Sequence, residues 1–465
     1  MSAEYKVFDT IIVGSGQGGN PLALALAKAG QQVALVEREY VGGSCINFGC
    51  TPTKTMIASA RVAHLVGRAK GYGVNATFGA VDLQAVLKRK QEMVESFRGG
   101  SEKRLLSTKG ISLIKGSARF VGKKQLEVEL STGGKKLIKA ETVVIDTGTS
   151  PAIPSIPGLD AAIALDSTSI MEIDRLPDHL LVLGGGYVGL EFGQMFLRFG
   201  SKVTIIQRSG QLLSREDEDI AEEIAAILRQ EGMEVLLDTE TLRVETPESE
   251  KIILTVRSDG KEKVLQGSHL LVATGRIPNT SYLDPAATGI TIDENGFIPV
   301  NDRLETTVPG IYAIGDVNGG PAFTHISYDD HKILLENVLG GGNASVSGRI
   351  LPYVVFIDPQ LGRVGITEKE ANELGYDYRV AKIPMSWVAR ALETDETRGM
   401  MKAIVDAKTG QILGAAILSV EGGELMSALQ IAMLGKVPYT VLREGMFAHP
   451  TLSESFNTLF SALED

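Results

Sequence analysis

The sequence predicts an α/β fold in which a first βαβ unit is interrupted by a second, similar unit and followed by a C-terminal α+β domain. The first observation is a glycine-rich segment near the N-terminus that recurs 170 residues later. The second is a pair of turn-rich segments, TGTSP at 147–151 and ATGRIPN at 273–279, which bracket the second copy as two chain crossings would. The third is a change of pattern beyond the glycine-rich stretch 340–348, where strand-like runs precede an amphipathic helix.

The two copies occupy residues 9–37 and 179–207, and each runs apolar strand, glycine turn, helix and Val-rich strand. Glycines spaced G-x-G-x-x-G allow a tight turn, a close approach of backbone to a pyrophosphate, and close packing of helix on strand. The N-terminus of the helix then faces the phosphates. The repeat therefore predicts two Rossmann-like dinucleotide sites. Their glycines are Gly14, Gly16 and Gly19 in the first copy and Gly184, Gly186 and Gly189 in the second.

The residue that closes the second strand of such a unit indicates which dinucleotide binds, because it receives the ribose hydroxyls of the adenosine. In the first copy this residue is Glu37, which suits FAD or NAD and would repel a 2′-phosphate. In the second copy it is Gln207, and Arg208 and Arg215 follow closely. Guanidinium groups without a competing carboxylate favour a phosphate, so NADPH is expected there. The alternative is NADH, with the two arginines merely at the surface.

The only two cysteines, Cys45 and Cys50, lie in the segment GGSCINFGCTPTK. Their spacing and the lack of a second pair do not fit a tetrahedral zinc site, so no metal site is expected. A helix beginning near residue 44 would place both sulfurs close to its N-terminus, where the helix dipole lowers the pKa of a thiol. The pair therefore suits dithiol–disulfide exchange beside a cofactor; the alternative is a structural, buried pair.

Length and charge limit the class of protein. A chain of 465 residues is expected to form two or three domains. The net charge of −11 disfavours nucleic acids and anionic lipids as partners. The N-terminal residues do not form a signal peptide, and no run approaches the roughly 18 apolar residues of a membrane-spanning helix. A cytoplasmic protein with no membrane partner is expected.

With these motifs the sequence resembles the pyridine nucleotide-disulfide oxidoreductases, the family of glutathione reductase, dihydrolipoamide dehydrogenase and mercuric reductase. The resemblance covers essentially the whole chain. It implies an FAD-binding domain at 1–148 and 276–341, an NAD(P)H-binding domain at 149–275, and a dimerisation domain at 342–465. The motifs that carry it are GSGQGG (14–19), GGSCINFGC (42–50), GGGYVGLE (184–191), ATGRIPN (273–279), IYAIGDV (311–317) and HPTLSE (449–454).

The resemblance also implies residue roles. Cys50 resembles the sulfur beside the flavin that forms a charge-transfer thiolate, and Cys45 the interchange sulfur that attacks substrate. Lys54 and Glu191 resemble an ion pair near the flavin, and Tyr187 an aromatic gate over it. Further cofactor contacts are implied for Ser44, Gly148, Gly275, Thr324 and Asp316, the last of which resembles the carboxylate that holds the ribityl chain.

His449 and Glu454 resemble an acid–base dyad that one subunit of a homodimer supplies to the cysteines of its partner. Thiol–disulfide exchange needs a group that takes a proton from one thiol and returns it to another, and a histidine suits that task. A carboxylate behind the ring fixes the tautomer and stabilises the imidazolium.

Three features depart from the family pattern. The chain lacks the additional cysteine pair of mercuric reductases, so efficient mercury reduction is not expected. Gln207 replaces the acidic residue usual in dihydrolipoamide dehydrogenases, and Asp146 replaces a small residue before the TGxxP turn. The C-terminal segment 437–460 most resembles bacterial flavoproteins linked to reactive-chlorine stress and copper(II) reduction.

The expected activity is transfer of electrons from NAD(P)H through FAD to the cysteine pair, and then to a small-molecule or small-protein disulfide. Reduction of copper(II) or mercury(II), dihydrolipoamide dehydrogenase activity, and a non-enzymatic FAD-binding redox sensor are the alternatives. Retention of both cysteines and of the dyad disfavours the sensor.

Overall fold

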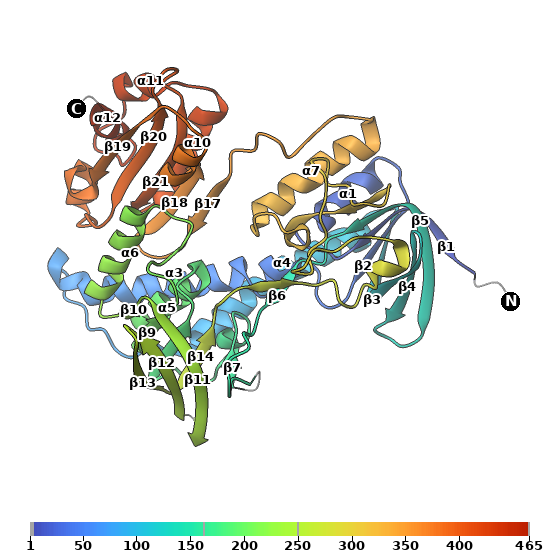
Figure 1. Ribbon diagram of the computed structural model, residues 1–465, viewed down its shortest axis with the longest axis horizontal. Coiled ribbons are helices and arrows are strands. Elements are labelled where there is room, and N and C mark those ends of the chain that lie inside the picture. The colour runs from blue at the N-terminus through green and yellow to red at the C-terminus, as the bar shows by residue number, and fades with distance from the viewer. Residues whose placement is uncertain (1–3, 161–162, 249–250, 464–465) are drawn as a thin grey trace. The chain divides into compact units, whose positions relative to one another are not determined.

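The computed structural model describes residues 4–160, 163–248 and 251–463 (Figure 1). The chain divides into two compact units. The first unit combines residues 1–56, 84–152 and 275–348, and the second combines residues 57–83, 153–274 and 349–465.

The first unit is built on a mainly parallel sheet. Strands β1 (Lys6–Val13), β2 (Val33–Glu37), β3 (Ile111–Gly122), β5 (Lys135–Ile145) and β16 (Ile311–Ala313) pair in parallel in the order β3-β2-β1-β5-β16. Strand β4 (Gln125–Leu130) pairs antiparallel with β3 and β5. The run Ile11–Val13 is fully apolar and buried, as expected for a strand covered on both faces.

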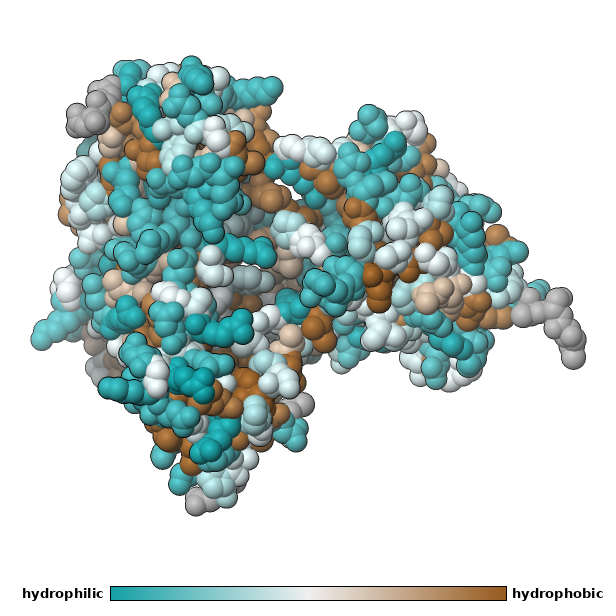
Figure 2. Space-filling view, viewed as in Figure 1, coloured by the Kyte–Doolittle hydropathy of each residue, from teal (hydrophilic) through white to brown (hydrophobic). Residues whose placement is uncertain are grey.

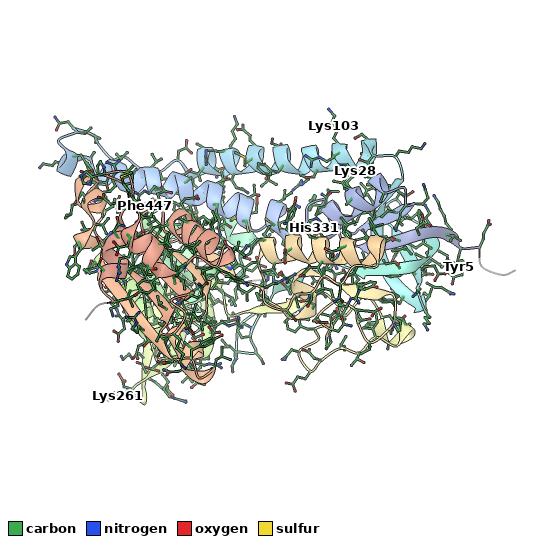
Figure 3. All side chains as sticks on the ribbon, turned by 90° about the horizontal axis from the view of Figure 1, so that it is seen from above. Tyr5, Lys28, Lys103, Lys261, His331 and Phe447 are labelled. Atoms are coloured by element: carbon green, nitrogen blue, oxygen red, sulfur yellow. The ribbon has the colours of Figure 1, made fainter. Side chains whose placement is uncertain are left out.

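Two helices cover the sheet of the first unit where the nucleotide turn lies. Helix α1 (Gly19–Lys28) connects β1 to β2, and it packs against α7 (Thr324–Gly340). Figure 3 shows Lys28 at the end of α1 and His331 on α7. Leu22 and Leu26 of α1 and Leu334 of α7 share one buried cluster with the sheet. Helix α4 (Leu83–Ser107) precedes β3.

The segments predicted as the two chain crossings lie side by side. Strand β6 (Thr149–Pro151) pairs antiparallel with β15 (Arg276–Pro278), and the side chain of Arg276 donates to the backbone oxygen of Thr149 at 2.7 Å. The chain therefore leaves the first unit and returns to it at one place.

The second unit contains the second copy of the repeat. Strand β8 (His179–Leu183), helix α5 (Tyr187–Phe199) and strand β9 (Lys202–Ile206) form a parallel βαβ unit. The sheet order is β10-β9-β8-β14-β7, with β7 (Ala164–Leu165), β10 (Glu234–Leu236) and β14 (His269–Val272). Helix α6 (Glu218–Gln230) and the antiparallel strands β11 (Thr239–Glu248), β12 (Lys251–Ser258) and β13 (Lys261–Gly267) complete it.

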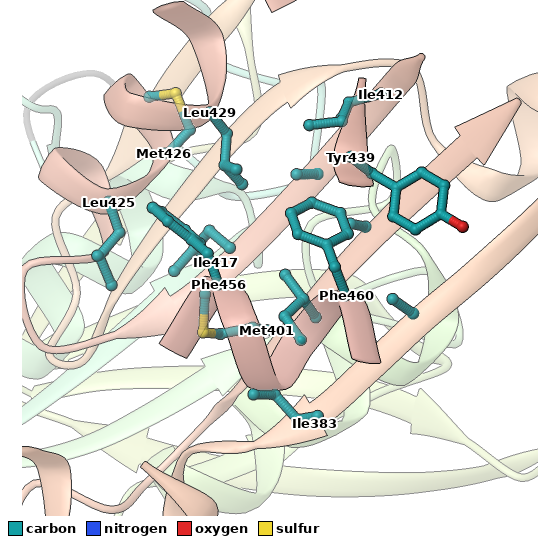
Figure 4. Close-up of a cluster of buried hydrophobic side chains, with 14 of the residues drawn as sticks. Ile383, Met401, Ile412, Ile417, Leu425, Met426, Leu429, Tyr439, Phe456 and Phe460 are labelled. Carbon is teal, nitrogen blue, oxygen red and sulfur yellow. The ribbon is translucent and has the colours of Figure 1, made fainter. Parts of the chain in front are cut away.

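The C-terminal part of the second unit is an antiparallel sheet with helices on one face. Its order is β17-β18-β21-β20-β19, with β17 (Pro352–Val355), β18 (Gln360–Gly365), β19 (Tyr378–Pro384), β20 (Met400–Asp406) and β21 (Ile412–Ser419). Figure 4 shows side chains of α10 (Gly422–Leu434) and α12 (Ser455–Ser461) packed on these strands. Short helices α8 (Glu368–Glu373), α9 (Ala389–Glu393) and α11 (Tyr439–Glu444) complete this part. The predicted fold class is confirmed.

Buried ion pairs join the nucleotide-binding and C-terminal parts of the second unit. Arg363 on β18 lies 2.5 Å from Glu216 and 3.1 Å from Asp217, and all three side chains are at most 5% exposed. Asp217 also lies 3.4 Å from the buried Lys402 of β20. Such pairs are costly to break because the remaining charge stays buried.

The surface is mixed in polarity. On the face drawn in Figure 2, hydrophilic and hydrophobic residues are interspersed. Within residues 4–160, 163–248 and 251–463, every helix is too short or too polar to cross a lipid bilayer.

Candidate active site

The first nucleotide turn connects β1 to α1 and requires glycine at two places. Gly14 has a positive φ of 104°, and a Cβ there would lie 2.1 Å from the backbone oxygen of Asp146. A Cβ on Gly19 would lie 2.3 Å from the backbone oxygen of Gly14. The turn therefore holds the N-terminus of α1 directly above the end of β1, where helix N–H groups can receive phosphate oxygens.

Glu37 closes β2 beside this turn, as the sequence predicts for a ribose-binding carboxylate. Its Oε2 accepts hydrogen bonds from the backbone N–H of Ser15 at 3.0 Å and from the Ser15 hydroxyl at 2.6 Å. The side chain is buried and its position is fixed by the turn.

The other residues predicted to contact the first dinucleotide line the same unit. A Cβ on Gly148 would meet nothing within 4 Å, so the backbone there borders open space. Oδ2 of Asp316 accepts from the Thr149 hydroxyl at 2.9 Å. Gly43 approaches so closely that its Cβ would lie 2.7 Å from the Cα of Gly16, and the exposed Ser44 follows it. Three features fit a dinucleotide of the size of FAD: the close approach of backbone at Gly43, the carboxylate of Glu37 at the end of β2, and the open space beside Gly148.

The cysteines lie on two helices rather than on the one helix that the sequence predicts. Cys45 belongs to the short α2 (Gly43–Asn47), and Cys50 is the first residue of the 19-residue α3 (Cys50–Arg68). The break falls at Gly49, whose Cβ would lie 3.0 Å from the backbone oxygen of Ser44. Cys50 nevertheless starts a long helix, the position that stabilises a thiolate.

The two thiols and Thr324 form one small cluster. Sγ of Cys50 lies 3.4 Å from Oγ1 of Thr324, the first residue of α7. A hydrogen bond to Cys50, together with burial, raises the pKa of the Cys45 thiol, whereas Thr324 and Lys54 act in the opposite direction and more weakly. Cys45 therefore keeps its proton at neutral pH.

The second nucleotide turn repeats the geometry of the first. Gly184 has φ +106°, and a Cβ there would lie 2.5 Å from the backbone oxygen of Ala273. A Cβ on Gly189 would lie 2.1 Å from the backbone oxygen of Gly184. Around Gly186, in contrast, a Cβ would meet nothing within 4 Å, so the turn borders open space.

Gln207 takes the place of Glu37 in the second copy. Its Oε1 accepts from the backbone N–H of Gly185 at 2.9 Å, as Glu37 accepts from Ser15, and its Nε2 donates to the backbone oxygen of Gln211 at 3.2 Å. Arg208 and Arg215, both exposed, follow in the same loop. The amide thus reproduces the support of the turn without adding negative charge.

Tyr187 and Glu191 lie on the first turns of α5. Tyr187 begins the helix and is half-buried. Glu191 is buried, and its Oε1 accepts from the backbone N–H of Phe356 at 2.9 Å. Lys54, half-buried on α3, lies in the other unit, so its ion pair with Glu191 stays a prediction.

Gly275, which precedes β15, is exposed with φ +149°.

His449 and Glu454 form the predicted pair within one chain. Nδ1 of His449 lies 2.9 Å from Oε2 and 3.0 Å from Oε1 of Glu454. The His449 side chain is 65% exposed, so its second ring nitrogen can reach a group outside this chain. A hydrogen bond from Nδ1 to the carboxylate leaves Nε2 to exchange a proton.

Sequence reasoning missed two buried carboxylates behind the first nucleotide turn. Asp330 on α7 accepts from the backbone N–H of Gly315 at 2.8 Å. Asp146, noted only as a departure from the family, accepts from the backbone N–H of Gly19 at 2.7 Å. No pattern in the sequence marks either residue, because each partner is distant in the chain or hidden in a turn.

Two family descriptions match the chain. The pyridine nucleotide-disulphide oxidoreductase family matches residues 8–330, and its dimerisation domain matches residues 351–460. The chain belongs to this family. It is therefore an FAD-dependent flavoprotein that uses NAD(P)H. The presence of the dimerisation domain indicates a homodimer.

Several relatives of this oxidoreductase cover nearly its whole length. The probable pyridine nucleotide-disulfide oxidoreductase RclA of Escherichia coli (strain K12) is 40% identical over 98% of this chain and 99% of the relative. A mercuric reductase of Bacillus cereus is 36% identical over 96% of this chain and 70% of the relative. A dihydrolipoyl dehydrogenase of Thermus scotoductus is 35% identical over 98% of each chain.

Solved structures agree with these sequence relationships. The HOCl-induced flavoprotein disulfide reductase RclA from Escherichia coli matches this oxidoreductase with a TM-score of 0.88 and 39% identity, over 98% of this chain and 100% of that one. Its Cu(II) complex matches with a TM-score of 0.89 and 39% identity, over 98% and 99%.

Proposed function

We propose that this oxidoreductase passes electrons from NADPH to a Cys45–Cys50 disulfide and then to the disulfide of a small molecule or small protein. The observation that carries the proposal is the position of Cys50. Its sulfur lies at the start of α3, 3.4 Å from Thr324 and in the same unit as the nucleotide turn that Glu37 supports. A thiolate at that place is stabilised by the helix and lies on the element that adjoins the cofactor turn.

The residues of the first unit are proposed to hold FAD. When bound, FAD supplies the group that accepts hydride from the nicotinamide and passes an electron pair to the disulfide. The α1 turn receives the pyrophosphate and Glu37 the ribose. The remaining proposed contacts are Gly14, Gly16, Gly19, Ser44, Lys54, Gly148, Gly275, Asp316 and Thr324. The proposed functional domains are 1–148 with 276–341 for FAD, 149–275 for NAD(P)H and 342–465 for dimerisation.

The second turn is proposed to bind NADPH in preference to NADH. Support comes from the neutral Gln207 at the strand end and from the exposed Arg208 and Arg215 beside it. Gln207→Glu keeps the oxygen that accepts from Gly185 and adds the charge that Glu37 carries in the first copy. The variant is expected to raise the KM for NADPH at least tenfold and to change the KM for NADH little. Equal effects on both coenzymes would contradict the preference.

The protonation states of Cys45 and Cys50 determine the order of the steps in thiol exchange. The Cys45 thiol gives its proton to Nε2 of His449, and its sulfur attacks one sulfur of the acceptor. The first leaving thiolate takes that proton from His449. The Cys50 thiolate then attacks the Cys45 sulfur, which restores the internal disulfide, and the second leaving thiolate takes a proton from solvent water. One disulfide is reduced to two thiols while the cysteine pair loses two electrons.

The histidine is proposed to come from the partner subunit of a homodimer. Support comes from its exposure and from the position of the dyad in the dimerisation domain, between residues 351 and 460. The test is complementation between two inactive variants, Cys45→Ser and His449→Ala. A mixed dimer has one intact site if the histidine acts in trans, so a statistical mixture is expected to recover about a quarter of wild-type activity. No recovery in verified mixed dimers would overturn the assignment.

Copper(II) reduction is a second candidate, because a solved relative is a Cu(II) complex. Two Cu(II) ions would take one electron each from the dithiol, which forms the disulfide and releases two protons. Copper would act in this reaction as a substrate; among the described residues, no group of three or more His, Cys, Asp or Glu side chains is placed to hold a metal. His449→Ala is expected to lower disulfide turnover by about 10² to 10⁴ and to spare copper reduction.

An acceptor panel separates the remaining alternatives. Lipoamide, glutathione disulfide, copper(II) and mercury(II) are each supplied with NADPH or NADH, and the kcat/KM of each is compared. A strong preference for NADH with lipoamide would favour a dihydrolipoamide dehydrogenase.

A cytoplasmic location fits a dithiol that must remain reducible, since the cytoplasm keeps thiols reduced.

A further inference from the structure

The two nucleotide turns differ at one buried side chain. The backbone N–H of Asp146 donates to the oxygen of Val13 at 2.8 Å, and that of Ala273 donates to the oxygen of Leu183 at 2.8 Å. Asp146 and Ala273 each precede a Thr-Gly pair and each face the first glycine of a turn. They therefore occupy equivalent places, one with a carboxyl group and the other with a methyl group.

The carboxyl group of Asp146 lies at the N-terminus of α1. Its Oδ2 accepts from the backbone N–H of Gly19, the first residue of the helix, at 2.7 Å. A Cβ on Gly16 would lie 2.8 Å from the same oxygen, whereas a Cβ on Gly186 in the second copy would meet nothing. The acidic side chain therefore reaches the part of the turn that faces the phosphates of a bound dinucleotide.

Other carboxylates approach Asp146 from three neighbouring elements. Glu37 ends β2, Asp316 lies in the turn after β16, and Asp330 lies on α7. Burial raises the pKa of Asp146 well above its usual value, the hydrogen bond from Gly19 opposes that rise, and the three carboxylates add to it. His331, beside Asp330 on α7 (Figure 3), has a pKa lowered by burial, so it stays neutral above pH 6.5.

We propose that Asp146 couples the binding of FAD to the uptake of one proton, so that FAD is held with Asp146 as a neutral carboxylic acid. This inference rests on the assignment of FAD to the first nucleotide turn. An ionised Asp146 repels the pyrophosphate, whereas a protonated one adds no charge and still accepts from Gly19. The pyrophosphate in turn makes Asp146 harder to ionise. Binding and protonation therefore favour one another.

The direction of the pH dependence follows. As pH rises through the pKa that Asp146 has in the protein without FAD, the Kd for FAD increases, by up to tenfold per pH unit, until the pKa of the complex is reached. Asp146→Asn keeps an oxygen for Gly19 and cannot ionise. Asp146→Ala installs the residue that the second turn carries. Both variants are expected to bind FAD with a Kd that changes little between pH 6 and 9, and more tightly than wild type at pH 9.

The test uses the full chain after removal of FAD. FAD is titrated back between pH 6 and 9, and the Kd is read from flavin fluorescence. Calorimetry at pH 8 in phosphate and in Tris gives the protons taken up, because these buffers differ in ionisation enthalpy. Wild type is expected to take up protons, and both Asp146 variants to take up fewer. The matched control is Asp9→Asn, because the exposed Asp9 accepts from the backbone N–H of Gln32 at 2.7 Å and is expected to keep the wild-type slope.

A flat wild-type profile, or equal slopes in wild type and both variants, would overturn the inference and leave the proposed function intact. Failure of the wild-type chain to bind FAD at any pH would overturn the assignment of FAD and the inference together. Misfolding of Asp146→Ala is not expected, because Ala already occupies the equivalent place of the second turn.

Discussion

A hydrogen bond to Cys50 keeps the Cys45 thiol protonated, and this protonation determines what the neighbouring residues must do. The hydrogen bond to Cys50 and burial hold the pKa of Cys45 above its usual value. A protonated thiol is a poor nucleophile, so attack on an acceptor requires a base. We propose that His449 of the partner subunit, oriented by Glu454 at 2.9 Å, is this base.

Removal of that base gives the first prediction. His449→Ala is expected to lower kcat/KM for a disulfide acceptor by about 10² to 10⁴, the usual range for loss of a general base. Glu454→Gln keeps the size of the side chain, removes its charge, and is expected to lower the rate in the same direction. Steady-state rates with NADPH measure both effects. Reduction of ferricyanide, which needs no thiol proton transfer, serves as the control and should stay near the wild-type rate.

Residue roles could be predicted to different degrees. The cysteine pair and Glu37 stand in short, contiguous motifs, so the sequence alone indicated them. The contact between Cys50 and Thr324 joins residues 274 positions apart, and only the resemblance suggested Thr324. The burial of Asp146 among three other carboxylates depends on β2, the turn after β16 and α7 meeting at one place, which a single sequence does not reveal.

The two βαβ elements give the next prediction, because they differ in the space around the middle glycine. Gly186 has φ −79°, which suits any residue, and a Cβ there meets nothing within 4 Å. Gly186→Ala is therefore expected to leave the melting temperature and FAD content unchanged. The added methyl group would stand where a pyrophosphate approaches, so the KM for NADPH is expected to rise about tenfold or more.

Gly14→Ala is the contrasting variant. Its φ of 104° and a Cβ 2.1 Å from the backbone oxygen of Asp146 make any side chain strained. Loss of both FAD content and thermal stability is expected. If Gly186→Ala unfolded the protein as readily as Gly14→Ala, the open space inferred around Gly186 would be contradicted.

Helices were predicted well where they follow a glycine turn and less well at the cysteines. Helices α1 and α5 begin at the glycine turns, as the fingerprint predicts. The single helix expected across the cysteines is instead divided into α2 and α3, because the backbone at Gly49 closes against Ser44. Close packing of this kind depends on the folded loop and not on hydrophobic periodicity.

On the scale of the whole second unit, stability depends on charges buried between its two parts. Arg363→Met leaves Glu216 buried without its guanidinium and is expected to lower the free energy of unfolding by about 3–5 kcal/mol. Burial raises the pKa of Glu216 even in the native protein. Without Arg363 that pKa rises further, so the loss of stability should be larger at pH 8 than at pH 5. Urea unfolding at both pH values measures it.

An exposed pair provides the control for this prediction. Arg257 and Glu240 lie 3.1 Å apart, and both side chains are about half exposed. Arg257→Met is expected to change the free energy of unfolding by about 0–1 kcal/mol, as is usual for surface pairs. Similar losses for both arginine variants would argue against the burial of charge as the cause. The sequence offers no signal for the Arg363 pair, whose members are 147 residues apart.

Electron transfer to the cysteine pair can be measured by counting thiols, because Cys45 and Cys50 are the only cysteines of the chain. The oxidised protein is mixed anaerobically with one equivalent of NADPH per chain, unfolded in denaturant, and titrated for free thiols. The thiol count is expected to rise from none to two per chain, and no such rise is expected in Cys50→Ser. A flavin that is reduced while the thiol count stays at zero would contradict it.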